Sequence, residues 1–302
     1  MRIGRPAEVH QKLGGVVSDA IRVDGLLDLK ATLQSGQAFR WSRDGEWYEG
    51  VIFGNLVRLR RTPEGVEFTS FPEPEDAFKD RLADYLGLSD DLDAIYRSIG
   101  VDEHVKAAIE RYPGMRILRQ EPWECVVSFI CSAWSNVRRV STTVESLSAK
   151  FGEPIATNGT MRSAFPTPEQ LAATDEQAMR LLGLGFRAKY IPASAKLVAE
   201  GRVNLLALRE APFEEALDAV MSLPGIGDKV ANCIMLFSLV QRSAFPVDLW
   251  IRRVLSDMYL GEAGQKMSVP KVRVWAQEYF GPYAGYANHY LFHDWRNAGK
   301  RS

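Results

Sequence analysis

Between residues 25 and 71, apolar residues occur in short runs separated by glycine, asparagine, aspartate and proline. Such a pattern is typical of β-strands joined by tight turns. It predicts strands over residues 26–33, 38–42, 47–53, 56–61 and 66–70. Strands connected this closely pair with their neighbours, so we expect one antiparallel sheet. The residues before about position 22 carry no such pattern, and we expect a loosely ordered lead-in there.

After residue 71 the apolar positions recur three and four residues apart, which predicts helices. The expected helices cover residues 72–87, 92–99, 101–112, 122–134, 136–151, 191–200, 213–221, 229–240 and 249–255. From residue 121 onward we expect only helices. The predicted fold class is therefore α+β. A twisted antiparallel sheet domain with helices would occupy residues 1–112, and an all-α region with two helical subdomains around a cleft would occupy residues 113–302. Pro113 marks this boundary, and a boundary near Phe71 is the alternative.

The composition is that of an ordinary globular protein. Of the 302 residues 46% are hydrophobic and 25% are charged, and the net charge of −1 provides no overall attraction to nucleic acid. Any nucleic-acid surface must therefore be local. The three cysteines, Cys125, Cys131 and Cys233, are too few and too widely spaced for a disulfide framework or a zinc site. Reduced thiols in an intracellular compartment, cytoplasm or nucleoid, are the simplest interpretation. The amino terminus shows no apolar signal core, and no run is long enough to span a membrane.

The candidate chemistry concentrates in residues 222–248. The sequence Leu-Pro-Gly-Ile-Gly places Gly225 and Gly227 on either side of one apolar residue. Because glycine tolerates positive φ, this pattern predicts a hairpin whose main-chain N–H groups point outward. The helix expected next begins near Asp228, so its unpaired N–H groups and the positive end of its dipole meet the hairpin. We expect this hairpin to hold a phosphate.

Lys229 occupies an unusual position for a lysine. In the first turn of the expected helix an ammonium faces the positive end of the helix dipole, where a carboxylate is favoured. This position favours the neutral amine, which is a nucleophile able to form a Schiff base. A solvated surface lysine is the alternative interpretation, and on Lys229 alone it would be preferred.

Asp248 gives Lys229 a partner. The helix after Lys229 climbs roughly 17 Å, and the extended segment that follows it, residues 241–248, reaches up to about 26 Å. The chain can therefore return to the end where the helix started. Asp248 is also the expected N-cap of the next helix, a structural role compatible with a functional one. Cys233 lies one helical turn after Lys229 on the same face, so we expect its thiol to border the same cavity.

These motifs resemble those of a known family. A hairpin of the form L-P-G-I-G, a lysine two residues after its last glycine and P-V-D after the next helix are similar to the helix-hairpin-helix DNA glycosylases. The lysine-bearing, bifunctional branch fits best, specifically the 8-oxoguanine DNA glycosylase/lyases. The resemblance implies an enzyme that flips 8-oxoguanine out of damaged double-stranded DNA and excises it. Lys229 would attack C1′ of the sugar, Asp248 would stabilise the charge that develops there, and the Schiff base would cleave the strand by β-elimination.

The resemblance also implies a pocket for the extruded base. The segment S-G-Q-A-F-R-W around Gly36 is similar to the family's S-G-Q-x-F-R-W, in which the glycine carbonyl accepts a hydrogen bond from N7–H of the oxidised purine. Gly36 would thus be the discriminator between damaged and normal guanine. The later segment G-P-Y-A-G-Y-A-N-H-Y-L-F is similar to G-P-Y-A-G-W-A-Q-x-x-L-F. Phe292 would stack on the base, with Cys233 opposite it. Asn288 stands where a glutamine of the family reads the Watson–Crick edge.

Further matches imply contacts with the duplex itself. The segment L-G-L-G-F-R-A-K-Y resembles the family's L-G-L-G-Y-R-A-x-Y, so Phe186 would be the wedge inserted beside the lesion and Arg187 a partner of the orphan base. The alternative for Phe186 is an ordinary loop aromatic. Arg139 matches an arginine of the family that contacts the orphan base.

In two further places the chain departs from the family. Asparagines usually follow the helix predicted at residues 122–134, and this chain has Trp134, Ser135 and Asn136 there. Asn136 would retain a contact with the orphan base, whereas Trp134 would fill the space left by the extruded base by stacking. Trp250 stands where the family has a histidine at the 5′ phosphate of the lesion.

Two other functions stay open. The substitutions at Trp134, Trp250 and Asn288 fit a glycosylase of the same scaffold for another base lesion. A non-catalytic damage-binding protein would also use the hairpin, but it would not need the Lys229 amine beside the Asp248 carboxylate. We expect damaged double-stranded DNA as partner, a monomer, and no metal bound by side chains. An iron–sulfur cluster with four cysteine ligands cannot form on the three cysteines.

Overall fold

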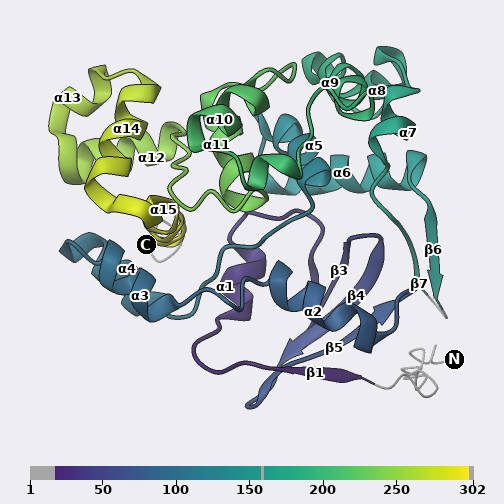
Figure 1. Cartoon of the computed structure of the whole chain (residues 1–302), viewed down its shortest axis with the longest axis horizontal. Coiled ribbons are helices and arrows are strands. Elements are labelled where there is room, and N and C mark those ends of the chain that lie inside the picture. The colour runs from purple at the N-terminus through teal and green to yellow at the C-terminus, as the bar shows by residue number, and fades with distance from the viewer. Residues whose placement is uncertain (1–17, 158–159, 299–302) are drawn as a thin grey trace, which may run out of the picture.

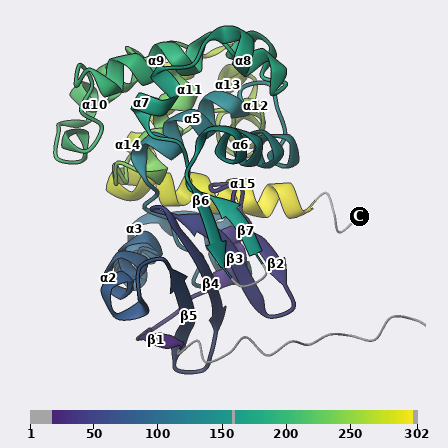
Figure 2. The ribbon, with the colours of Figure 1, turned by 90° about the vertical axis from the view of Figure 1, so that its right-hand side faces the viewer.

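The computed structural model of the chain describes residues 18–157 and 160–298. An antiparallel sheet with flanking helices forms one part of the molecule, and a larger helical part lies against it (Figure 1). Figure 2 shows the C-terminal helix α15 (Ala284–Ala298) lying between the helical part and the sheet. The predicted α+β class, an antiparallel sheet followed by a mostly helical region, is confirmed.

The sheet has the strand order β1-β5-β4-β3-β2, and every pair in it is antiparallel. Its strands are β1 (Asp19–Arg22), β2 (Ser42–Asp44), β3 (Trp47–Ile52), β4 (Asn55–Arg61) and β5 (Gly65–Phe71). The strands predicted at residues 47–53, 56–61 and 66–70 are thus confirmed. The strand predicted at 38–42 is wrong except for its last residue, because residues 38–41 form a loop. Strand β1 lies in the predicted lead-in, whose first 17 residues fall outside the described residues.

The strand predicted at residues 26–33 is also wrong, since the chain forms helix α1 (Leu29–Gln34) there. The Asp28 side chain accepts a hydrogen bond from the N–H of Ala31 at 2.8 Å, which caps the helix. Leu29 and Leu33, four residues apart, are both buried. The same leucines satisfy a strand pattern and a helix pattern, and the cap and the packing select the helix.

The helical part begins with α2 and continues to the last described residue. Its helices are α2 (Glu75–Tyr85), α3 (Leu92–Ile99), α4 (Glu103–Arg111), α5 (Pro122–Ser132), α6 (Val137–Phe151), α7 (Pro168–Ala172), α8 (Glu176–Leu181), α9 (Tyr190–Ala199), α10 (Phe213–Met221), α11 (Asp228–Phe237), α12 (Leu249–Leu255), α13 (Gly261–Lys266) and α14 (Val269–Phe280), with short 3-10 turns η1 (Gly185–Arg187), η2 (Ala207–Arg209) and η4 (Gly281–Tyr283) and the π-helical turn η3 (Ser256–Leu260).

Every helix predicted from the sequence is present, with three differences in detail. Helix α11 ends at Phe237, three residues before the predicted end, and Val240 has a φ of 60° that no helix accepts. The expectation of only helices after residue 121 is wrong, because β6 (Pro154–Thr157) and β7 (Thr160–Ser163) form a hairpin. Ile155 of this hairpin packs on the sheet residues Val51 and Leu56. Helices α7, α8, α13, α14 and α15 were not among those listed individually from the sequence.

Two large hydrophobic cores hold the described part of the molecule together, beside the small cluster around Ile155. One core joins the sheet to α1 and α2, and the other joins α3 and α4 to the later helices. Helix α15 contacts α3 and α4 directly, and the hydroxyl groups of Tyr96 and Tyr290 are 2.8 Å apart across that contact. Helices α3 and α4 lie before residue 112 in the chain but share a core with the helices that follow it. The division into two domains at residue 112 stays a prediction.

The loop between α1 and β2, residues 35–41, is fastened by its own buried side chains. The Nε2 of Gln37 donates to the carbonyl oxygens of Thr32 at 2.8 Å and Arg116 at 2.9 Å. Its Oε1 accepts from the N–H of Leu118 at 2.8 Å. Gln37 is wholly buried. A buried amide with satisfied donors and acceptor holds this loop in a single position.

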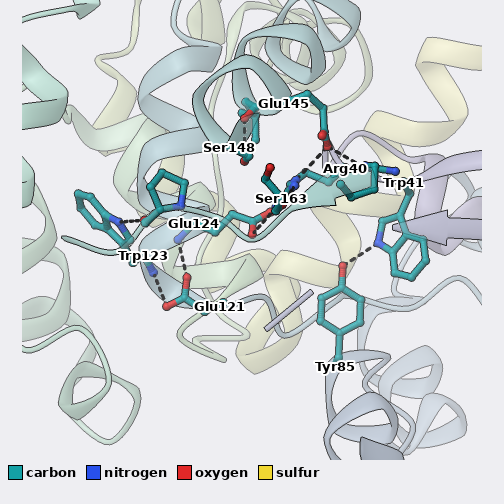
Figure 3. A network of polar contacts seen from close by, with 12 residues as sticks. Arg40, Trp41, Tyr85, Glu121, Trp123, Glu124, Glu145, Ser148 and Ser163 are labelled. Carbon is teal, nitrogen blue, oxygen red and sulfur yellow. Dashed lines mark hydrogen bonds and ion pairs between the residues drawn. The ribbon is translucent and has the colours of Figure 1, made fainter. Parts of the chain in front are cut away.

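Arg40 fastens the same loop to the helical part (Figure 3). Its Nε donates to Glu145 of α6 at 2.9 Å, and its Nη2 donates to the carbonyl oxygen of Ser163 in β7 at 2.6 Å. Glu124 of α5 lies 3.7 Å from its Nη1. The guanidinium is almost completely buried, so its positive charge is compensated by these carboxylates inside the protein. The loop is thereby fixed at both its ends.

The carboxyl group of Glu124 makes the stability of this network depend on pH. Burial raises the pKa of Glu124 to about 7, against the opposing effect of Arg40 and with the help of the neighbouring Glu121 and Glu145. The folded state therefore binds a proton more tightly than the unfolded state. The proton bound by Glu124 therefore stabilises the folded state below the ordinary pKa of a glutamate, and this stabilisation is lost as the pH rises toward 7.

We expect Glu124→Gln to remove this dependence, because glutamine has no titrating proton. The unfolding free energy of the natural protein minus that of the variant should fall by about 2–3 kcal/mol as the pH rises from about 4.5 to about 7.5. Urea unfolding followed by circular dichroism at both pH values measures the difference. Buried His289, whose pKa burial lowers to about 3, contributes the opposite slope but is the same in both proteins. Parallel pH profiles of the two proteins would contradict the assignment.

Candidate active site

A pocket of about 80 Å³ opens between α11, α12, α15 and the loop after α1. Its lining includes the residues predicted to carry catalysis and base recognition, namely Gly36, Lys229, Cys233, Asp248, Asn288 and Phe292. They come from separate segments of the chain, and the fold brings their side chains to one cavity. The DNA-binding candidates Asn136, Arg139, Phe186, Arg187, Trp134, Trp250, Gly225 and Gly227 are not among the lining residues and lie elsewhere.

The hairpin before α11 determines where Lys229 lies. Gly225 has a φ of +84°, and a Cβ there would lie 2.5 Å from the ring of Tyr190. Only glycine therefore fits this turn. Gly227, with φ of −106° and ψ of 179°, is the N-cap of α11, so the expected helix start is confirmed. Lys229 follows in the first turn, and its Nζ lies 5.5 Å from the centre of the Phe129 ring. An ammonium over an aromatic face is held in place within the pocket.

Asp248 reaches the same pocket from the other end of the loop. It is the N-cap of α12, and its Oδ1 accepts a hydrogen bond from the N–H of Ile251 at 2.7 Å. The cap orients the carboxylate, and the positive end of the helix dipole stabilises its negative charge. The segment that leaves the C-terminal end of α11 thus brings Asp248 back to the pocket that holds Lys229 of the first turn, as the segment lengths predicted.

Cys233 lines the same pocket as Lys229 and Asp248. Burial raises the pKa of its thiol, the nearby Lys229 ammonium lowers it, and the Asp248 carboxylate raises it. The thiol therefore stays protonated, and a protonated thiol in this place acts as a small apolar wall.

Gly36 forms the wall opposite these groups. Its φ is +96°, and a Cβ would lie 2.7 Å from Nη1 of Arg296. That guanidinium donates to the carbonyl oxygen of Ser35 at 2.9 Å and so holds the turn. Burial lowers the pKa of Arg296. A side chain at position 36 would both strain the backbone and displace the arginine, whereas glycine leaves its main chain open to a flat ligand.

Helix α15 supplies the third wall. Asn288, Phe292 and Arg296 are four residues apart and share one face of the helix. The Nδ2 of Asn288 donates to the carbonyl oxygen of Pro246 at 2.9 Å. This bond uses one N–H of the amide and leaves its oxygen and second N–H for a ligand. Phe292 is partly exposed in the pocket, where a flat ring could stack on it.

Several pocket residues were not assigned a role from the sequence. They are Phe129, Phe237, Pro246 and His289, which line the cavity, and Arg296, which holds its glycine wall. Phe129 and Phe237 stack with ring centres 5.6 Å apart, and the apolar pattern alone marked them as core. The position of Arg296 in the sequence does point to the pocket, because it lies one helical turn after Phe292 on the same face of the helix.

The candidate DNA contacts gather at two exposed places outside the pocket. Trp134 is 86% exposed, and Phe186 is 49% exposed. Asn136 caps α6, its Oδ1 accepting from the N–H of Arg139 at 3.0 Å. The exposed Arg139 side chain approaches the carbonyl oxygen of Gly183 at 3.5 Å. These side chains mark one rim of the molecule.

Trp250 lies at the second place. Its ring contacts that of Trp295 with centres 4.8 Å apart, and the guanidinium of Arg253 lies 5.4 Å from its ring centre. Trp250 follows Asp248 by two residues, so this aromatic pair adjoins the pocket. An exposed aromatic face beside a cation can contact a sugar or a base as well as a phosphate.

Arg187 is mostly buried. Only 6% of the residue is exposed, and its Nε donates to the carbonyl oxygen of Ala133 at 2.7 Å. Arg187 thus binds protein main chain in this structure, and its contact with the orphan base stays a prediction.

The cysteines of this chain are not paired in disulfides. Cys125, Cys131 and Cys233 are all free thiols and buried. Within residues 18–157 and 160–298, no group of three or more histidine, cysteine, aspartate or glutamate side chains could hold a metal ion. None of the helices described there has the length and apolar character needed to cross a membrane.

Comparison with known proteins first defines the class. Residues 127–277 match the family model described as HhH-GPD superfamily base excision DNA repair protein. Residues 21–126 match the one described as 8-oxoguanine DNA glycosylase, N-terminal domain. The fold and the lysine-bearing hairpin are thus those of a base excision repair protein of the helix-hairpin-helix superfamily.

Relatives narrow the class to a family. N-glycosylase/DNA lyase OGG1 of Arabidopsis thaliana is 34% identical over 285 residues, covering 88% of this chain and 76% of the plant protein. Clostridium acetobutylicum 8-oxoguanine glycosylase/lyase, solved in complex with dsDNA containing cytosine opposite to 8-oxoG, is 30% identical with a TM-score of 0.86, covering 94% of this chain and 98% of that one. A solved MBOgg1 structure with a low affinity DNA ligand is 34% identical with a TM-score of 0.88, covering 94% and 97%. The chain belongs to the 8-oxoguanine DNA glycosylase family.

Proposed function

We propose that this protein is a bifunctional DNA glycosylase and lyase that excises 8-oxoguanine from double-stranded DNA. The observation that carries the proposal is the presence of Lys229, Asp248 and Cys233 in the lining of one small pocket. A duplex gives no access to C1′ of a stacked nucleotide, so the damaged nucleotide must turn out of the helix to enter this pocket.

The first chemical step is displacement of the base. The neutral amine of Lys229 forms a bond to C1′, and the bond between C1′ and the base breaks, with the electron pair and a proton leaving with the base. Positive charge grows on the sugar as that bond breaks. The Asp248 carboxylate, held by its cap, stabilises this charge without reorganising.

The second step cleaves the strand. Opening of the sugar ring converts the lysine adduct into a Schiff base, which makes a proton on C2′ acidic. Loss of that proton and expulsion of the 3′ phosphate complete the β-elimination. Water then releases Lys229. No redox reagent is needed for either step.

The base pocket explains the choice of lesion. Gly36 lines the pocket, and its main-chain carbonyl can accept from N7–H of 8-oxoguanine, which normal guanine lacks. Phe292 provides a stacking face and Cys233 the opposite wall. Asn288 contributes amide groups toward the Watson–Crick edge while it remains bonded to Pro246.

The hairpin provides affinity without sequence preference. Its main-chain N–H groups and the start of α11 suit a DNA phosphate, which positions the duplex and reads no base. A cation held by the hairpin main chain, and a monomeric enzyme, are parts of the same proposal. The turn geometry at Gly225 supports the former.

An incision assay with a panel of lesions tests the function. Duplexes containing 8-oxoguanine, an alkylated purine or uracil are incubated with the protein, with and without borohydride. We expect cleavage of the 8-oxoguanine strand and a covalent protein–DNA adduct that borohydride traps. Because Asn288 is already bonded to Pro246, preferential excision of another lesion is the second candidate. Binding of damaged DNA without cleavage or trapping of any duplex would overturn the enzymatic proposal.

A further inference from the structure

The turn of residues 35–37 is a wall between two cavities. Ser35, Gly36 and Gln37 all line the base pocket. Gly36 also lines a groove of about 740 Å³ between α1, α6 and α15. A main-chain wall with an open groove behind it receives little support from packing, so side-chain hydrogen bonds must keep it in place.

The carbonyl groups before and after Gly36 are each held by a side chain from a distant segment. Nη1 of Arg296 donates to the carbonyl oxygen of Ser35 at 2.9 Å. Nε2 of Gln120 donates to the carbonyl oxygen of Gln37 at 2.7 Å. Among the described residues, none of the hydrogen bonds uses the carbonyl oxygen of Gly36 itself. The acceptor that would meet N7–H of 8-oxoguanine therefore lies between two peptide groups that are fixed.

Arg296 supports the turn from the groove side. It lines the groove and is not among the residues that line the base pocket. Asp294, the one carboxylate of α15, pairs with Arg111 instead. Arg296 thus directs its charge to a main-chain carbonyl, although burial lowers its pKa. Its place in the last turn of α15 also suits the helix dipole, which is the purely structural alternative.

The same helix carries another wall of the base pocket. Asn288 and Phe292 line the pocket and lie eight and four residues before Arg296, on one helix face. A single rigid element therefore presents the stacking face of Phe292 and also holds the turn that carries the Gly36 carbonyl. The separation of these two groups determines which flat base fits between them.

We propose that Arg296 is a positioning residue for base recognition, which holds the Gly36 carbonyl where a purine stacked on Phe292 presents its N7–H. The inference rests on the proposed function and adds a specificity-determining group to it. Arg296 lies behind the turn and touches neither the base nor the sugar. Its loss should therefore weaken recognition of the base and leave the chemistry of Lys229 and Asp248 unchanged.

The first experiment compares two substrates that need the same lysine and differ in the base. Duplexes with 8-oxoguanine or with a preformed abasic site are cleaved by the natural protein and by Arg296→Met. Methionine is a good helix former that keeps the straight side chain but has no N–H donor. We expect kcat/KM for 8-oxoguanine to fall by roughly 3- to 10-fold, the scale of one hydrogen bond, and cleavage at the abasic site to be unchanged.

Lys30→Met is the matched control for the lost charge. Lys30 is exposed, lines the same groove and lies on α1. This variant should leave kcat/KM unchanged on both substrates. Equal losses on both substrates in Arg296→Met would indicate a purely structural role, and they would overturn the inference. Unchanged excision of 8-oxoguanine by Arg296→Met would overturn it too.

Arg296→Ala allows a chemical rescue. The shorter side chain leaves space for a guanidinium ion, which can enter from the open groove and donate to the Ser35 carbonyl. Guanidinium chloride at concentrations far below those that unfold proteins should restore most of the lost excision. Potassium chloride at the same ionic strength should not. Equal excision in the two salts would contradict the positioning role.

Hydrogen–deuterium exchange tests the support of the turn without DNA. We expect the amides of residues 35–38 to exchange faster in Arg296→Met than in the natural protein or Lys30→Met, because the turn loses its support on the groove side. Unchanged exchange would overturn the inference whether or not DNA is cleaved. Faster exchange, together with a natural protein that cleaves neither duplex, would reject the proposed function and still support the hold of Arg296 on the turn.

Discussion

Replacing Lys229 with glutamine will abolish both excision and borohydride trapping. Glutamine keeps the length and polarity of the side chain but has no nucleophilic amine. We expect the rate of base loss to fall by roughly 10⁴- to 10⁶-fold, the scale on which enzymes lose rate when a covalent nucleophile is removed. Single-turnover incision of an 8-oxoguanine duplex and gel detection of the trapped adduct measure the two effects.

Binding should survive this change, because the hairpin and the base pocket are left intact. A gel-shift assay with the lesion duplex therefore serves as the folding control. Lys196→Gln is the matched substitution at a lysine whose side chain is 70% exposed on α9 and pairs with Glu200 at 3.9 Å. It should leave trapping unchanged. An adduct formed by Lys229→Gln as efficiently as by the natural protein would remove Lys229 from its role.

Two substitutions at Asp248 should separate its charge from its cap. Asparagine caps a helix about as well as aspartate, so Asp248→Asn should change the unfolding free energy by only a few tenths of a kcal/mol. Its neutral amide cannot stabilise the positive charge that grows on the sugar. We expect single-turnover excision to slow by about 10²- to 10³-fold, as when one electrostatic group of a transition state is removed.

Asp248→Ala removes both the negative charge and the helix cap. The excision rate should fall by the same factor as in Asp248→Asn, and the unfolding free energy should fall by a further ~1 kcal/mol, because the N–H of Ile251 loses its acceptor. Denaturant unfolding and single-turnover kinetics on both variants give the comparison. Full activity in Asp248→Asn would show that the aspartate serves the fold alone.

The candidate site was predictable where it depended on short segments. The glycine hairpin, the first-turn position of Lys229 and the cap at Asp248 each depend on residues within a few positions of one another. The return of the chain to the start of α11 followed from segment lengths alone. The four-residue spacing of Asn288 and Phe292 is also a local property, and it puts both on one face of α15.

Positions that depend on distant partners were predicted less well. A strand over residues 26–33 and helix α1 are both compatible with the same leucines, and burial against the sheet favours the helix. Strand β1 exists because β5 offers it hydrogen bonds from more than forty residues away, with Asp19 opposite Phe68. No local pattern in a four-residue segment shows such a partner.

The surroundings of Arg187 also depend on a partner that is distant in the sequence. Its motif predicted a contact with the orphan base, and the structure buries its guanidinium against Ala133, 54 residues earlier in the chain. Trp134 was visible in the sequence as a departure from the family, but its left-handed backbone and its exposure were not.

The sequence by itself determined the chemistry of this protein, because a nucleophilic amine, a capping carboxylate and a phosphate-binding hairpin are properties of residue type and local spacing. Only the tertiary structure decided how these groups share one small pocket with Gly36 and α15, and which arginine is buried against main chain. Contacts between segments far apart in the chain make those choices, since burial and hydrogen bonding there outweigh what each segment prefers alone.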